Sequence, residues 1–231
     1  MVKKTLILFF GASSGIGQKL INLLNRKYKV ICFYNKNKIK VKKGIELKKI
    51  DFLKQNEINK ISAIKSLQNH NIVILNFATV KIDKLSIYVI DKEFRKTIDI
   101  NVKSFLKIIN TIIPYMMKNN WGRIINISSA GGSKGDKGTL LYSISKNASE
   151  TMMNVMAKEY GKFDITFNNL KLGNFDYGLF KKFDINLKKK LLNKVPSKKT
   201  GDVKNIFFAI EFLIKSDYIN GSSISIDGGS E

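Results

Sequence analysis

Tyr142 and Lys146 stand four residues apart in a segment with helical periodicity. Residues i and i+4 of an α-helix lie on one face, with Cβ atoms about 6 Å apart, so both side chains are expected to enter the same cleft. A free tyrosine has a pKa near ~10, and a neighbouring ammonium favours its phenolate form. The pair therefore predicts proton exchange with a substrate oxygen, with Lys146 lowering the pKa of Tyr142. Taken singly, each residue could be an ordinary member of an amphipathic helix.

A glycine-rich run from Gly11 to Gly17 could bind phosphate. It follows the apolar residues 5–10 and opens an amphipathic segment at residues 16–26. A glycine loop at a helix N-terminus lets backbone N–H groups approach a pyrophosphate, and the helix dipole favours the negative charge. The run indicates dinucleotide binding, although a tight strand-to-helix connection could use the same glycines.

These groups need a scaffold, and the chain alternates apolar runs of strand length with amphipathic runs of helix length. This pattern is typical of parallel strands joined by crossover helices. The predicted strands are residues 5–10, 30–34, 46–51, 72–76, 124–128, 165–170 and 223–227, and the longest predicted helices are residues 91–118 and 142–160. No Gly/Ser-rich linker or internal repeat divides the chain, so residues 1–231 are predicted to form one α/β domain.

Residues 173–196 interrupt this regularity, because their aromatic side chains are interleaved with lysines without clear periodicity. An apolar, weakly regular insertion can serve as a lid over a substrate. We expect this segment to cover the substrate, with ordinary core packing as the alternative.

The composition excludes several classes of protein. The formal net charge is +23, yet all basic residues except Arg26, Arg95 and Arg123 are lysines spread along the chain, so a compositional bias explains the charge better than nucleic-acid binding. Cys32 and His70 are the only residues of their types, which disfavours a disulfide, a metal site and hydrolase chemistry. No apolar run approaches the ~20 residues that cross a bilayer. A soluble cytoplasmic protein without a membrane partner is expected.

The ordered motifs resemble the short-chain dehydrogenase/reductase family. Its Tyr-x-x-x-Lys motif matches residues 142–146, its serine matches Ser129 thirteen residues earlier, and its fourth catalytic position matches Asn101. Further matches are Asn76, Ala78, Asp51 and the C-terminal residues 220–229, so the resemblance extends from Thr5 to Gly229. It implies a single Rossmann-type doubly wound domain, with a parallel sheet of about seven strands in the order 3-2-1-4-5-6-7 flanked by helices.

The resemblance implies a role for each matched residue. Tyr142 would exchange the proton, Ser129 would hold the substrate oxygen, and Asn101 would support a water relay behind Lys146. The implied cofactor contacts are Gly11, Ser13, Ser14, Gly15, Ile16, Gly17, Tyr34, Asn35, Lys36, Asp51, Phe52, Asn76, Ala78, Tyr142, Lys146, Gly173 and Phe175. No metal is implied. Phe10, Thr79 and Leu172 depart from the family's usual residues.

The resemblance also bears on the choice of cofactor. NAD-preferring relatives place an acidic residue where Tyr34 stands, and a carboxylate there would repel a 2′-phosphate. With Lys36 and Lys38 nearby, NADP(H) is favoured over NAD(H), although a lysine-rich chain places cations near many sites.

The implied function is transfer of hydride between a nicotinamide cofactor and a carbonyl or secondary alcohol, on a small-molecule or carrier-linked substrate. The layout is nearest to the 3-oxoacyl-acyl-carrier-protein reductase branch. The alternatives are an enzyme acting on a sugar or nucleotide-linked sugar in surface-polysaccharide synthesis, where Lys181 and Lys182 could meet phosphate, and a nucleotide-binding regulatory protein without turnover.

The resemblance further implies a homodimer or homotetramer paired through the two long helices. The two helices contain more apolar side chains than packing against one face of the sheet requires. These side chains include Phe105, Ile108, Ile109, Ile112, Met152, Met153 and Met156.

Overall fold

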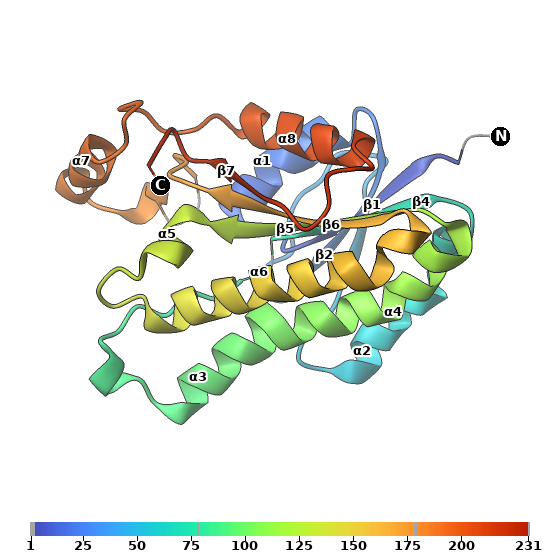
Figure 1. The fold of residues 1–231 in the computed structure, drawn as a ribbon, viewed down its shortest axis with the longest axis horizontal. Helices are drawn as coiled ribbons and strands as arrows, with labels where there is room; N and C mark the ends of the chain where they lie inside the picture. The colour runs from blue at the N-terminus through green and yellow to red at the C-terminus, as the bar shows by residue number, and fades with distance from the viewer. Residues whose placement is uncertain (1–2, 78, 178–179, 231) are drawn as a thin grey trace.

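The computed structural model describes residues 3–77, 79–177 and 180–230. Within these ranges a seven-stranded sheet has the order β3-β2-β1-β4-β5-β6-β7, and every neighbouring pair is parallel (Figure 1). The strands are β1 Thr5–Phe10, β2 Lys29–Tyr34, β3 Glu46–Lys49, β4 Asn71–Asn76, β5 Gly122–Ser129, β6 Ile165–Leu172 and β7 Ser223–Ile226. The predicted α/β class and strand order are confirmed.

Helices cover both faces of the sheet, because the central strands are apolar on both sides (Figure 1). One face carries α1 Gly15–Leu24 and α8 Val203–Lys215, and the other carries α2 Gln55–Asn59, α4 Ser104–Asn119 and α6 Leu140–Tyr160. The shorter segments are α3 Asp91–Ile98, α5 Ala130–Lys134, α7 Ile185–Asn193, the 3-10 turns η1 Lys60–Ala63, η2 Lys65–Gln68, η3 Ser86–Tyr88, η5 Gly161–Phe163 and η6 Phe180–Lys182, and the π-helical turn η4 Asp99–Lys103.

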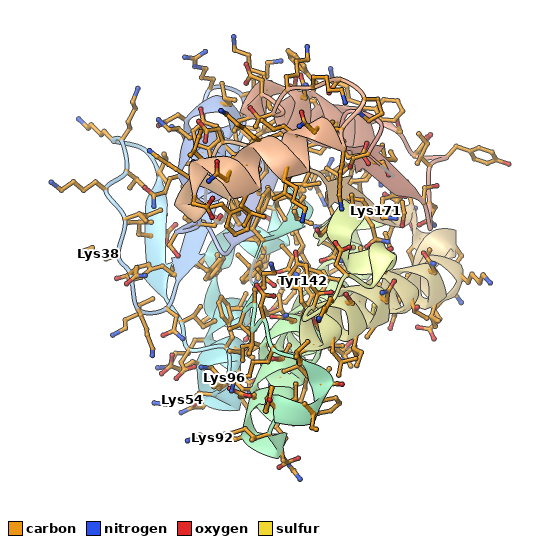
Figure 2. All side chains as sticks on the ribbon, turned by 90° about the vertical axis from the view of Figure 1, so that its left-hand side faces the viewer. Lys38, Lys54, Lys92, Lys96, Tyr142 and Lys171 are labelled. Carbon is orange, nitrogen blue, oxygen red and sulfur yellow. The ribbon has the colours of Figure 1, made fainter. Side chains whose placement is uncertain are left out.

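The functional edge of the sheet follows from the strand order. β1 pairs with both β2 and β4, so the connections after β1 and β4 leave toward opposite faces, and a crevice opens beyond the strand ends. Figure 2 looks onto this end of the molecule, with Tyr142 near the middle and Lys38, Lys54, Lys92 and Lys96 toward its periphery. Exposed lysines therefore lie toward the edge of the end of the molecule that carries Tyr142.

The predicted helix over residues 91–118 is interrupted. A π-helical turn, η4, separates α3 from α4, and the Ser104 N–H bonds to the carbonyl of Asp99, five residues back. Single π turns inside helices occur frequently at functional sites. Asn101 lies in this turn and is 4% exposed.

The apolar residues predicted to pair two subunits belong to the protomer's own core. Phe105, Ile108, Ile109, Ile112, Met153 and Met156 are buried together between the sheet, α4 and α6, and Met152 is partly buried against them. A long helix buries an apolar face against its own sheet whether or not a second subunit packs on its outer face. The apolar content of these helices therefore could not distinguish core residues from subunit-interface residues.

The segment at residues 173–196 is more regular than predicted. It includes η6 and the nine-residue helix α7, whose N-cap Asp184 accepts a hydrogen bond from the backbone N–H of Leu187. In the described part of the chain, no helix has the length and apolar character needed to cross a membrane.

Candidate active site

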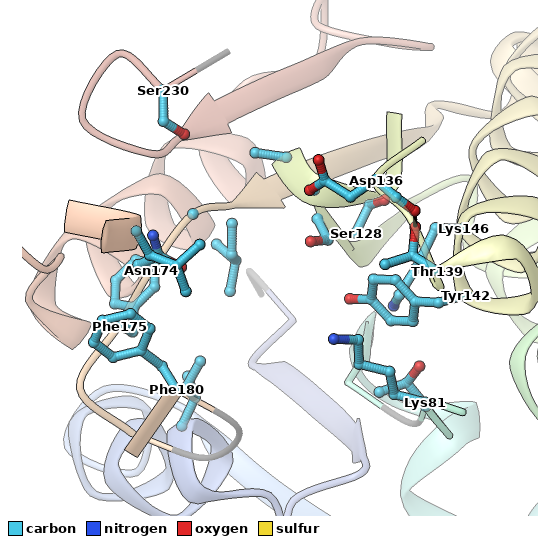
Figure 3. A pocket seen from close by; sticks show the side chains of 18 of the residues that line it. Lys81, Ser128, Asp136, Thr139, Tyr142, Lys146, Asn174, Phe175, Phe180 and Ser230 are labelled. Carbon is cyan, nitrogen blue, oxygen red and sulfur yellow. Dashed lines mark hydrogen bonds between the residues drawn. The ribbon is translucent and has the colours of Figure 1, made fainter. Parts of the chain in front are cut away.

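A cavity of about 630 Å³ opens at the carboxyl ends of the central strands (Figure 3). Its walls come from the loop after β1, the loop after β4, the end of β5, the first turns of α6 and residues 173–195. Of the residues predicted for the site, it brings together Ser14, Gly15, Ile16, Ser129, Tyr142, Lys146, Gly173 and Phe175.

Tyr142 and Ser129 meet inside this cavity. Tyr142 lies in the first turn of α6, and its ring is directed into the cavity, which the Ser129 side chain at the end of β5 also lines. A carbonyl oxygen placed beside these two hydroxyls could accept a hydrogen bond from each. The arrangement can therefore polarise a carbonyl and supply a proton to it.

Lys146 lies one turn further along α6, as the spacing predicts. Its Nζ is 5.8 Å from the centre of the Tyr142 ring and donates a 2.8 Å hydrogen bond to the carbonyl of Ile127. Only 6% of the residue is exposed. The ammonium is thus fixed beneath Tyr142 by a backbone carbonyl of β5.

The expected lowering of the Tyr142 pKa is wrong for this geometry. Burial raises the pKa of Tyr142 above its ordinary value of 10.0, and the Asp83 carboxylate adds to the rise, while the Ser129 hydrogen bond opposes it. Burial also lowers the pKa of Lys146 to about 8, and the Glu150 carboxylate opposes that shift. The i, i+4 spacing indicated contact but not the depth of burial, which decides both directions.

Glu150 acts on this group from the next turn of α6. Its carboxylate accepts a hydrogen bond from the Ser128 hydroxyl, next to Ser129 on β5. Glu150 was not among the residues predicted from the sequence, although it follows Lys146 at the same i, i+4 spacing that links Tyr142 to Lys146.

Asn101 braces the site from outside the cavity. Its Oδ1 accepts from the Val80 N–H at 2.7 Å, and its Nδ2 donates to the Val80 carbonyl and to Ser145 Oγ, both at 2.9 Å. Ser145 Oγ in turn donates to the carbonyl of Tyr142 at 2.9 Å. Asn101 therefore ties the loop after β4 to the first turn of α6.

The glycine-rich run forms a tight turn into α1. Ser14 caps α1, with its Oγ accepting from the Gly17 N–H at 3.0 Å, and Gly11 has a φ of 77°, which favours glycine. A Cβ on Gly17 would stand 2.8 Å from both the Ala12 carbonyl oxygen and Ser14 Oγ. The turn brings Ser14, Gly15 and Ile16, at the N-terminus of α1, to the cavity wall, and a helix N-terminus favours an anion.

The residues predicted to bind the adenosine part lie on neighbouring strand ends, outside the cavity. The Tyr34 carbonyl accepts from the Ile50 N–H at 2.8 Å, which places Tyr34 beside the chain that leads to Asp51. Asp51 Oδ1 accepts from the Leu53 N–H at 3.1 Å, in the turn between β3 and α2, whose N-cap is Lys54. Phe52 packs edge-on against Phe10 in the core, which leaves only its backbone for a ligand.

Asn76 faces the interior of the fold. Its Nδ2 donates to Asn126 Oδ1 at 3.2 Å, and Asn126 Nδ2 donates to Asn169 Oδ1 at 3.0 Å, forming an in-register row across β4, β5 and β6. The row links strands whose ends carry the site. Ala78, the adjacent predicted contact, lies outside the described residues.

Gly173 and Phe175 line the cavity but already make backbone hydrogen bonds. The Gly173 N–H donates to the Ile226 carbonyl at 3.0 Å, and the Phe175 carbonyl accepts from Tyr177 at 2.6 Å. A Cβ on Gly173 would stand 2.6 Å from Asp227 Cα, so close strand packing explains this glycine.

The sequence analysis missed several charged residues of the cavity wall. Lys81, Asp83, Asp136, Lys137 and Lys194 line it, all from connecting loops. Loops carry no periodic pattern that would predict where a side chain points. Among the described residues, no cluster of three or more His, Cys, Asp or Glu side chains could hold a metal ion.

Comparisons with known proteins agree with this geometry. The family model described as short chain dehydrogenase matches residues 5–187. Proteins named 3-oxoacyl-[acyl-carrier-protein] reductase FabG are 29% identical in Buchnera aphidicola subsp. Schizaphis graminum, covering 99% of this chain and 98% of that protein, and 29% identical in Rickettsia typhi, covering 96% and 95%. The solved structure described as ElxO with NADP bound superposes with a TM-score of 0.87 at 23% identity, covering 99% of both chains, and has the same fold.

Proposed function

Because the chain belongs to the short-chain dehydrogenase family and is an NAD(P)-dependent oxidoreductase, we propose that it reduces a carbonyl to a secondary alcohol. The observation that carries the proposal is the meeting of Ser129, Tyr142 and Lys146 in a cavity that the α1 N-terminus also borders. One cavity can then hold the cofactor's pyrophosphate near one end and a carbonyl near the other.

The residues would divide the reaction between them. A bound dihydronicotinamide supplies the hydride that the carbonyl carbon accepts. Ser129 holds the carbonyl oxygen, and Tyr142 donates its hydroxyl proton to that oxygen, so that hydride and proton together give a neutral alcohol. In the opposite direction Tyr142 would accept the alcohol proton. Lys146 supplies positive charge beneath Tyr142, which stabilises the phenolate that remains after proton transfer.

The cavity wall supports an acyl-type substrate. Phe77, Phe180, Phe183, Leu187, Leu191 and Val195 contribute apolar side chains to it. Similarity to the 3-oxoacyl-[acyl-carrier-protein] reductases points the same way, and a lysine-rich surface would suit an acidic carrier protein. In this proposal residues 173–196 cover the substrate within the single domain.

The other candidates have less support. Lys181, offered for a sugar-linked phosphate, is exposed and outside the cavity wall, and the Lys182 side chain lies outside the described part of the chain. A regulatory protein without turnover would have no need to keep Asn101, Ser129, Tyr142 and Lys146 as one connected group.

NADP(H) is the proposed cofactor. Tyr34 contributes no carboxylate to repel a 2′-phosphate, and Lys36 and Lys38 are exposed on the loop that follows it. The ElxO structure, which shares the fold, was solved with NADP bound.

We further propose that the protein forms a homodimer or homotetramer in the cytoplasm. The proposed contact surface differs from the one predicted from the sequence, because those apolar residues are buried in the core. Leu106 on α4 and Ile144 and Val155 on α6 are exposed, and the last two are eleven residues apart on one helix face. Two such faces packed about a two-fold axis would bury these side chains. Light scattering at micromolar concentration should give at least twice the mass of 26.2 kDa, and Val155→Lys should lower it. A monomeric wild-type protein would contradict this part.

The catalytic proposal is tested by Tyr142→Phe with acetoacetate and with an acetoacetyl thioester as alternative substrates. The variant keeps the ring and removes the transferable proton, so turnover should fall by about 10²- to 10⁴-fold while NADPH affinity is retained. Turnover above roughly a tenth of the wild-type rate would show that Tyr142 is not the proton donor.

A further inference from the structure

Lys81 is a cavity residue that the proposed mechanism does not use. It follows Val80, whose backbone N–H and carbonyl are both bonded to the Asn101 side chain. Three residues later the Lys84 N–H donates to the Gly138 carbonyl at 2.9 Å. The short loop is therefore held on both sides of Lys81.

The Lys81 ammonium lies beside the tyrosine. Lys81 Nζ is 5.6 Å from the centre of the Tyr142 ring, and Figure 3 shows the ammonium and the Tyr142 hydroxyl on the same side, both directed into the cavity. Lys146 lies at 5.8 Å from the same ring but is bonded to the carbonyl of Ile127. Lys81 is thus the cation that a substrate in the cavity would meet next to the reacting oxygen.

Lysine-rich composition does not explain this placement. Exposed lysines such as Lys54 and Lys92 lie at the periphery of this end of the molecule (Figure 2), whereas only 21% of the Lys81 side chain is exposed. A partly buried ammonium needs a counter-charge, and its present partner is Asp83 at 2.9 Å. The Asp83 side chain is 52% exposed, so water can solvate that carboxylate when another anion takes its place.

The other charged side chains of the cavity wall also favour an anion. The charged side chains that line it are the lysines Lys81, Lys137, Lys146 and Lys194 and the aspartates Asp83 and Asp136. A substrate carboxylate that enters this positive, partly dry space gains a charge-assisted hydrogen bond.

We propose that Lys81 is a specificity-determining residue that binds a carboxylate of the substrate, within a few bonds of the carbonyl held by Ser129 and Tyr142. The inference rests on the proposed carbonyl reduction and decides between its two substrate forms. A free 3-oxo acid presents such a carboxylate, whereas a carrier-linked thioester presents no charge at that place.

The test compares acetoacetate with ethyl acetoacetate, which differ in charge beside the same 3-oxo group. Binding to the NADP⁺-loaded protein is measured by ligand-observed NMR, which does not depend on turnover. The wild-type protein should bind acetoacetate more tightly than the ester. Lys81→Gln should weaken acetoacetate binding by roughly 10- to 100-fold and change binding of the ester by less than about threefold.

Two further variants separate charge from structure. Lys81→Arg keeps the positive charge and should therefore keep the preference for acetoacetate. If Lys81→Gln acted only by disturbing the fold, restoring the charge with arginine would not be expected to restore this preference. Lys92→Gln removes an equal charge from α3, outside the cavity wall, and should leave both affinities unchanged.

The outcomes distinguish this inference from the function on which it rests. Equal affinity for the two compounds in the wild-type protein, or equal acetoacetate affinity in wild type and Lys81→Gln, overturns the role of Lys81 even if NADPH is oxidised. Lys81-dependent acetoacetate binding without oxidation of NADPH by either compound supports the anion site and contradicts the proposed reduction.

Discussion

The two sides of the cavity are built in different ways. On the side proposed to bind the cofactor, the loop between β1 and α1 is one short run whose contacts are local, such as the hydrogen bond from the Gly17 N–H to Ser14 Oγ. On the substrate side, Lys81, Phe180 and Val195 come from loops and turns far apart in the sequence. The cofactor side can therefore be recognised from residue spacing, whereas the substrate side exists only after the chain has folded.

The first prediction tests whether the cofactor side works as a separate unit. Gly17→Ala places a Cβ 2.8 Å from the Ala12 carbonyl oxygen and Ser14 Oγ, so the loop must shift. If restoring the wild-type loop shape on binding costs about 1 to 3 kcal/mol, the range for overpacking, NADPH should bind roughly 5- to 150-fold more weakly. Fluorescence titration measures the affinity.

Gly161→Ala is the matched control, because its Cβ would be 3.3 Å from a side-chain nitrogen of Asn220 at the opposite end of the sheet. It should leave NADPH affinity unchanged. At saturating NADPH the Gly17→Ala protein should still turn over near the wild-type rate. Unchanged NADPH affinity in Gly17→Ala would contradict the pyrophosphate assignment.

A second effect tests the proposed adenosine end of the site. Wild-type protein should bind NADPH more tightly than NADH by about 1 to 3 kcal/mol, the range of charge-assisted hydrogen bonds, and added salt should reduce the gap. Tyr34→Asp should reverse the preference, because a carboxylate repels the 2′-phosphate and accepts from a ribose hydroxyl. Equal affinities of the wild-type protein at low salt would return NAD(H) as an equal candidate.

Most of the fold could be predicted from the sequence, because hydrophobic periodicity and glycine placement are local signals. The sheet order and the pairing of Tyr142 with Lys146 along α6 followed from such signals and from the family resemblance. The π-helical turn at Asn101 could not be predicted, since it depends on contacts with Val80 and Ser145 from other segments. The raised pKa of Tyr142 likewise depends on burial in the assembled site.

A third predicted effect concerns stability on the substrate side. Burial lowers the pKa of Lys146 from 10.5 to about 8, so between these pH values the folded protein binds fewer protons than the unfolded chain. The free energy of unfolding should therefore rise with pH in this window, by about 2 to 3 kcal/mol, and Lys146→Met should lack that rise. Urea unfolding of both proteins from pH 7 to pH 10 measures the free energy of unfolding at each pH. An equal dependence on pH in the wild-type and Lys146→Met proteins would show that Lys146 is not buried as described.

Deuteride transfer in a single turnover tests the central claim most directly. Protein saturated with NADPH that carries deuterium at the transferable position is mixed with a 3-oxo substrate, and the product is analysed by NMR. We expect deuterium on the new alcohol carbon with wild-type protein, and a rate at least about 100-fold lower with Tyr142→Phe at equal NADPH occupancy. An alcohol without deuterium, or equal rates in the two proteins, would contradict it.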